Sequence, residues 1–264
     1  MPAQYREPVW HLSRKLALAT TATALAVLVA APPAPSASAA SGHPGRYAPA
    51  RPLGDSSSIN WAGYETVGAP GQFNHVEARW TQPTAACTPG QETYAIFWVG
   101  LDGAQLGDTN VEQTGTGVDC EDDGSVEYYV WYEMFPDGPV LYNDPIRPDD
   151  HVQAEVRALG GDVFELVLRD FTQKWTEITY AKPPSGTGAV RNSAEVVAES
   201  PGDGSLLLTD FGRVSFTDSL VDMRRIGSLN PDKVAMLARD GKGTRAVPSP
   251  LTNDKDFSVA WKDY

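Results

Sequence analysis

Residues 126–135 read VEYYVWYEMF and residues 94–101 read YAIFWVGL. Aromatic and β-branched residues predominate in both segments, and glycine, proline or aspartate lies close to each end, which favours β-strands. Similar segments follow along the chain, at residues 73–80, 152–158, 163–169, 176–180, 195–199, 211–216, 234–238 and 257–261. No long segment after residue 57 has a helical period. This pattern predicts an all-β sandwich or barrel.

The composition supports the same class of fold. The 24 glycines and 21 prolines among 264 residues suit short elements joined by turns and argue against a helical bundle. A hydrophobic share of 41% is large enough for a buried core. The net charge of −13 argues against nucleic acid or an anionic membrane as a partner.

The first 40 residues have the features of a secretory signal peptide. Basic residues precede the apolar run at residues 16–31, and the small residues ASAA follow at 37–40. The alternative is a membrane anchor, but a span needs about 20 apolar residues and this run is shorter. We therefore expect a secreted, extracellular protein with no stable membrane association after cleavage. Residues 41–56 are expected to form a flexible leader or short propeptide, and residues 57–264 one domain.

The chain has two cysteines, Cys87 and Cys120. Two are too few for a four-cysteine zinc site or a dense disulfide scaffold. Export would place them in an oxidising compartment, where they can form a disulfide. The alternative is two free, buried thiols.

The alternation of side chains along each strand assigns polar groups to faces of the sheet. In residues 96–102, Phe97, Val99 and Leu101 form a core face, which leaves Trp98 and Asp102 on the other. By the same rule Trp131 shares a face with Glu133, and Glu195 with Glu199. Aromatic rings beside carboxylates favour a groove that binds an extended ligand. The alternative is a solvated outer face with scattered tryptophans.

Several common catalytic and metal motifs are missing. The sequence has no HExxH, no Cys-x-x-Cys, no Gly-x-Ser-x-Gly and no nucleotide-binding glycine pattern. Only His75 and His151 lie in the expected domain, and they are far apart in the sequence. The acidic turn at 119–124 does not match a calcium loop, because the twelfth position is Val130 and not glutamate. We therefore expect no metal and no cofactor.

Six short segments occur in an order and spacing that is specific when taken together. They are NWAGY at 60–64, WVGLDG at 98–103, EQTG at 112–115, WYEMFP at 131–136, AEVVAE at 194–199 and FGRVSF at 211–216. In this respect the chain resembles the glutamic peptidases (eqolisins, peptidase family G1) over about residues 58–262. The short leader and the Pro/Ala-rich signal favour a bacterial member.

The resemblance implies a sandwich of two antiparallel, seven-stranded sheets of the concanavalin A-like or jelly-roll type, with a substrate cleft on a concave face. It implies that Gln113 and Glu199 are the catalytic pair. Supporting cleft positions fall on Trp98, Asp102, Trp131 and Glu133, and the two cysteines resemble a family disulfide. Three positions depart from the family pattern, with Glu112 in place of leucine, Val196 in place of tryptophan and Tyr129 in place of aspartate.

These residues predict an acid endopeptidase that acts on proteins or peptides. Glu199 would accept a proton from water as general base, and Gln113 would stabilise the oxyanion. An ordinary glutamate pKa of about 4.3 predicts an acidic optimum. We expect a monomer. One alternative is a glycoside hydrolase that uses Glu133 and Glu199. Another is a non-catalytic carbohydrate- or peptide-binding sandwich, in which Trp61, Trp98 and Trp131 would contact the ligand.

Overall fold

The computed structural model describes residues 55–262 except 106–107, 186–187 and 203–204. The chain divides into two units, residues 1–42 and 43–264, and the described residues belong to the second. The predicted signal peptide and most of the predicted leader therefore lie outside the described residues. Within the described part, no helix is both long and apolar enough to cross a membrane.

The described unit consists of β-strands and a single 3-10 turn among the elements assigned. The strands are β1 (Asp55–Ser58), β2 (Trp61–Val67), β3 (His75–Thr81), β4 (Thr93–Leu101), β5 (Val111–Cys120), β6 (Val126–Phe135), β7 (Val140–Leu141), β8 (His151–Gly160), β9 (Val163–Asp170), β10 (Trp175–Ala181), β11 (Ser193–Glu199), β12 (Arg213–Val221), β13 (Arg224–Arg225), β14 (Asp232–Leu237), β15 (Thr244–Pro248) and β16 (Phe257–Trp261). The 3-10 helix η2 spans Ile226–Leu229. The predicted all-β class is confirmed.

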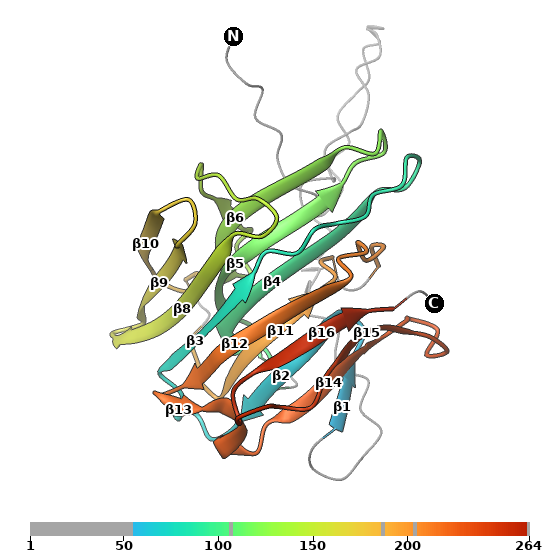
Figure 1. Ribbon diagram of the computed structural model, residues 1–264. Helices are drawn as coiled ribbons and strands as arrows, with labels where there is room; N and C mark the ends of the chain where they lie inside the picture. The colour runs from blue at the N-terminus through green and yellow to red at the C-terminus, as the bar shows by residue number, and fades with distance from the viewer. Residues whose placement is uncertain (1–54, 106–107, 186–187, 203–204, 263–264) are drawn as a thin grey trace, which may run out of the picture. The chain divides into compact units, whose positions relative to one another are not determined.

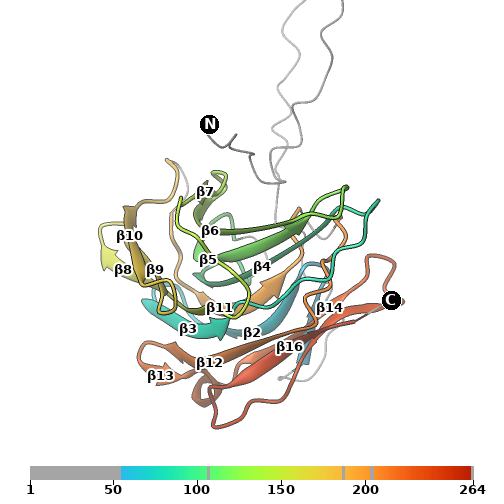
Figure 2. The ribbon, with the colours of Figure 1, turned by 45° about the horizontal axis from the view of Figure 1, so that its top comes forward.

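Fourteen of these strands form one hydrogen-bonded path in the order β10-β9-β8-β3-β12-β16-β15-β14-β2-β11-β4-β5-β6-β7. Figures 1 and 2 show the path bent over itself into two layers. One layer runs from β10 to β15 and the other from β14 to β7, seven strands in each. The two predicted sheets are therefore halves of one continuous sheet, joined where β14 pairs with β15. The path is antiparallel throughout, and β1 adds a parallel pairing with β14.

The core lies between the two layers. The layer with β4, β6 and β11 contributes Phe97, Val99, Leu101, Val130 and Val196 to it, and the other layer contributes Val76, Trp80, Leu166, Leu168 and Phe216. The alternation inferred for residues 96–101 is therefore confirmed, since the odd-numbered positions face the core. Apolar side chains buried on both inner faces hold the layers together.

A disulfide joins Cys87 to Cys120, as predicted, with 5.4 Å between the two Cα atoms. It ties the segment before β4 to the last residue of β5. This bond anchors one end of a strand pair whose outer face carries the candidate site.

Candidate active site

The outer face of β11, β4, β5 and β6 brings most of the predicted site residues together. In the register of these strands, Val197, Trp98, Gly115 and Trp131 lie in one row across the sheet. The next row on one side contains Glu195, Gly100, Gln113 and Glu133, and the next on the other side contains Glu199 and Tyr129. Because side chains two residues apart point to the same face, Trp98, Gln113, Trp131, Glu133 and Glu199 all lie on this face.

Gly115 makes room for the two large indoles beside it. A Cβ atom built on Gly115 would lie 2.0 Å from the carbonyl oxygen of Phe97 and 2.7 Å from Cβ of Trp98. Trp98 and Trp131 are both fully buried, on either side of this glycine. A glycine is therefore required at this position of the segment EQTG, because any side chain would collide with β4.

The carboxylate of Glu199, at the end of β11, is 6% exposed and is held by side-chain donors. The indole Nε1 of Trp98 donates to Oε2 at 2.7 Å, and the amide of Asn60 donates to Oε1 at 3.1 Å. The hydroxyl of Ser58 donates to Oδ1 of Asn60 at 2.8 Å, which orients that amide. Asn60 was not predicted as a site residue, although it begins the segment NWAGY that contributes to the family resemblance.

Burial and these donors act in opposite directions on Glu199. Burial penalises the charged form and raises the pKa of Glu199 to about 7, while hydrogen bonds from Trp98, Asn60 and Trp61 lower it. The indole of Trp61 packs edge-on against that of Trp98, with 5.1 Å between ring centroids. Glu199 therefore exchanges a proton near neutrality while its orientation stays fixed.

Gln113 and Glu133 form the second half of the site. The side-chain amide of Gln113 donates a short hydrogen bond to Oε2 of Glu133. The oxygen Oε1 of Gln113 is buried and has no hydrogen-bond partner in the described part of the chain. Burial first, and then the negative charge of Glu199, raise the pKa of Glu133 to about 8. Glu133 thus contacts Gln113 directly and is coupled to Glu199 electrostatically.

Asp102 follows the last residue of β4, so strand alternation does not assign it to the face of Trp98, and its place in the cleft stays a prediction. β4 ends at Leu101, and Asp102 takes a left-handed conformation with φ of 68°, so strand alternation no longer applies. Its carboxylate accepts the backbone N–H groups of Arg191 at 2.8 Å and Asn192 at 2.9 Å. Asp102 therefore fixes the segment that leads into β11.

A second buried carboxyl group lies beside Asp102. The amide of Asn110 donates to both Asp102, at 3.1 Å, and Glu112, at 2.7 Å. Glu112 is fully buried, and burial together with the charge of Asp102 raises its pKa to about 8. This residue replaces the family leucine, so a protonated carboxyl stands where an apolar side chain is expected.

The other two departures have different consequences. Val196 is buried in the core, away from the face that carries Glu199. Tyr129 lies on the site face, and its hydroxyl donates to Oδ1 of Asp119 at 3.1 Å. A Cβ atom on Gly117 would fall 2.2 Å from Cζ of Tyr129, so this ring covers the glycine. Asp119 thus supplies an acidic group on the same face, on the neighbouring strand and two residues beyond Gly117, which pairs with Tyr129.

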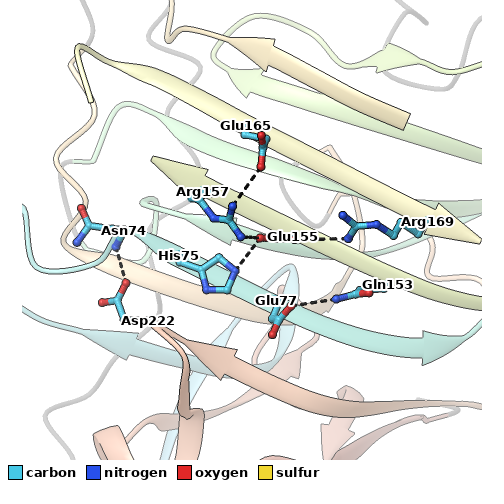
Figure 3. Close-up of polar contacts among 9 residues, drawn as sticks. All are labelled: Asn74, His75, Glu77, Gln153, Glu155, Arg157, Glu165, Arg169 and Asp222. Carbon is cyan, nitrogen blue, oxygen red and sulfur yellow. Dashed lines mark hydrogen bonds and ion pairs between the residues drawn. The ribbon is translucent and has the colours of Figure 1, made fainter. Parts of the chain in front are cut away.

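A polar cluster on the outer face of the other layer contains side chains of the kinds that bind metal ions (Figure 3). Possible ligand atoms of His75, Glu77 and Glu155 lie within 4.8 Å of one another. However, Glu155 also accepts from Arg157, and from Arg169 at 3.5 Å, besides His75 Nε2 at 3.1 Å. Two guanidinium groups on one carboxylate oppose a divalent cation there. The cluster is therefore an ion-pair network.

Comparison with known proteins identifies relatives of the whole described unit. The family model described as Peptidase A4 family matches residues 59–261. Aspergillopepsin-2 of Aspergillus niger is 28% identical over 184 residues, which are 61% of this chain and 64% of that relative. The chain thus matches slightly less than two thirds of the relative's length.

Three solved structures share the fold of the described unit. A scytalido-glutamic peptidase with a transition state analog inhibitor superposes with a TM-score of 0.64 at 23% identity, covering 77% of this chain and 98% of that one. SCP-B, described as a member of the Eqolisin family in a complex with the tripeptide Ala-Ile-His, gives 0.60 at 22% identity, with 77% and 98% covered. Aspergilloglutamic peptidase from Aspergillus niger gives 0.55 at 23% identity, with 64% and 99% covered.

Proposed function

Because this chain belongs to the Peptidase A4 family, the glutamic peptidases, we propose that it is an endopeptidase in which Glu199 and Gln113 act on a water molecule and the scissile peptide bond. The observation that carries this proposal is the fixed carboxylate of Glu199, held by Trp98 and Asn60 on the same face as Gln113.

The reaction needs only these two side chains and water. Ionised Glu199 removes a proton from water as the resulting hydroxide attacks the peptide carbonyl carbon. An amide has two N–H bonds; Glu133 accepts one from Gln113, and the other can donate to the oxyanion of the tetrahedral intermediate. Protonated Glu199 then gives its proton to the leaving amine, the C–N bond breaks, and Glu199 returns to its ionised form.

Glu133 acts as a positioning residue in this scheme. Its contact with Gln113 fixes which end of that amide faces the reaction, and leaves Oε1 to orient the water. Below its pKa of about 8, Glu133 is neutral and adds no negative charge beside the developing oxyanion. The site is therefore organised to work while Glu133 carries its proton.

The pH range follows from the same groups. A glutamate with its ordinary pKa would give an acidic optimum, but burial raises the pKa of Glu199 to about 7. The base is therefore protonated, and activity falls, as the pH drops below about 7. The protons of Glu112 and Glu133 are lost near pH 8. We place the optimum between these two losses, at a pH between about 7 and about 8.

Several wider properties belong to the same proposal. Two related structures carry a transition state analog inhibitor and a tripeptide, which supports proteins or peptides as substrates here. The sequence pattern supports secretion, with a signal peptide at residues 1–40, a leader at 41–56 and a catalytic domain at 57–264. A monomer without metal or cofactor is expected.

The test uses the purified full chain and an unfolded protein substrate, with product peptides identified by mass spectrometry. Glu199→Gln and Gln113→Ala are each expected to lower kcat at least about 100-fold, the range for loss of one oxyanion donor or general base. Glu92→Gln, an exposed carboxylate on the segment before β4, serves as the matched control and should retain activity. Cleavage that survives Glu199→Gln at full rate would refute this assignment.

A further inference from the structure

A depression of about 440 Å³ lies on the outer face of the layer formed by β3, β8 and β12. This is the opposite side of the sandwich from Gln113 and Glu199, since the core separates the two outer faces. Its polar lining consists of one guanidinium, one imidazole and three hydroxyl groups, and an aromatic ring forms one wall. These side chains are Arg79, His151, Thr81, Ser215, Thr217 and Phe171.

The strands beneath the depression leave no backbone edge for a ligand. β3 pairs with β8 and β12, β12 pairs with β16 as well, and β8 pairs with β9. An extended peptide gains much of its affinity by adding a strand to a free sheet edge. A ligand here must instead be recognised by side chains alone.

The lining groups suit a ligand that carries hydroxyls and a carboxylate. Hydroxyls of Thr81, Ser215 and Thr217 can both donate and accept, which matches the hydroxyls of a sugar. The ring of Phe171 is 52% exposed, and a backbone hydrogen bond to the carbonyl of His151 holds it at 2.9 Å. Such a ring offers an apolar surface for the C–H face of a sugar ring.

Arg79 supplies the charge. Its guanidinium lies over the ring of Phe171, 5.7 Å from the centroid, and about half of the side chain is exposed. It also faces Asp218 at 3.6 Å, but an exposed ion pair of that length is weak and yields readily to a bidentate carboxylate. None of the eight residues that line the depression is acidic, in a chain of net charge −13.

We propose that this depression binds an acidic sugar, a hexuronate unit of a polysaccharide, on the side of the enzyme that faces away from the catalytic pair. The carboxylate pairs with Arg79, the ring packs on Phe171, and the hydroxyls bond to Thr81, Ser215 and Thr217. The volume suits one or two sugar units. An enzyme attached in this way keeps its catalytic face free for protein substrates.

Isothermal titration calorimetry of the full chain with trigalacturonate tests the proposal. Neutral galactotriose and tri-D-glutamate, which resists cleavage, are the comparison ligands. Saturable binding is expected for trigalacturonate, with Kd raised about tenfold by Arg79→Gln and by Phe171→Ala, the loss expected for a charge-assisted bond or an aromatic wall. Tyr180→Ala removes an exposed ring of β10 outside the depression and should leave Kd unchanged.

The remaining outcomes each overturn the proposal. No saturable binding, or equal affinity in all four proteins, would exclude this site. Equal binding of tri-D-glutamate, insensitive to Phe171→Ala, would make it a site for acidic peptides. Loss of binding in Glu199→Gln would place the sugar on the catalytic face. Circular dichroism and thermal unfolding of each variant show that a change in Kd does not come from misfolding.

Discussion

The replacement of Glu112 by glutamine is expected to remove a large part of the pH dependence of stability. Glu112 is fully buried beside Asp102, and its pKa in the folded protein is about 8 against an ordinary 4.5. The folded state therefore binds a proton more tightly than the unfolded state does. Its stabilising effect is complete below the unfolded pKa and is lost as the pH rises through the folded pKa.

The magnitude follows from the difference between the two pKa values. One pKa unit corresponds to about 1.4 kcal/mol, so a rise from 4.5 to about 8 gives about 5 kcal/mol lost between about pH 4 and about pH 9. A glutamine at this position has nearly the same shape as the protonated carboxyl, is neutral at every pH, and keeps an oxygen that can accept from Asn110. The variant should match the parent protein near pH 4 and exceed its free energy of unfolding by several kcal/mol near pH 9.

Urea titrations at a series of pH values, with the disulfide intact, measure this free energy directly. Asp122→Asn, which removes an exposed carboxylate from the turn before β6, is the matched control and should leave the pH dependence as it is. If the parent protein and Glu112→Gln lose stability in parallel as the pH rises, then Glu112 does not hold a proton in the folded state and the reasoning fails.

Three further predictions concern the site and its supports. Trp98→Phe removes a charge-assisted donor from Glu199, so kcat/KM should fall about 10- to 100-fold and its acid limb should move to higher pH, as a pH–rate profile would show. Glu133→Gln keeps a neutral partner for Gln113, so the alkaline loss of kcat/KM near pH 8 should disappear; an unchanged alkaline limb would assign that limb to another group. Gly115→Ala should lower the free energy of unfolding by about 1–3 kcal/mol or more, because its Cβ would lie 2.0 Å from a backbone oxygen. Gly138→Ala, which has open space around it, should leave that free energy nearly unchanged in the same urea assay.

The strands that the sequence predicts well are those rich in aromatic and β-branched residues. β6 and β16 match the expected segments residue for residue. β5 was not predicted, because its sequence VEQTGTGVDC has no aromatic residue and contains two glycines, a glutamate and an aspartate, which are depleted in strands. Those glycines lie under Trp98 and Tyr129, so the packing that makes the strand possible comes from its neighbours. The strand that carries Gln113 therefore has the weakest local signal.

The site was predicted to the extent that strand alternation holds. Alternation placed Trp98, Trp131, Glu133 and Glu199 on one face, and the register confirms it. It does not extend to Asp102, because this residue follows the end of β4 and has a left-handed backbone conformation. The raised pKa of Glu199 could not be predicted from the sequence, since it depends on burial by segments far away in the chain.

The separation of Asn60 and Glu199 along the chain bears on when the enzyme becomes active during its synthesis. These two residues are 139 positions apart, and β2, which follows Asn60, pairs with β11 and then with β14. Pairing over such distances forms late, after the intervening chain is available. A growing chain that has not yet reached residue 199 lacks the base altogether, and one that has only just reached it lacks the neighbouring strand β14. In the mechanism proposed above, peptide cleavage by this chain therefore waits until nearly all of the polypeptide has been synthesised.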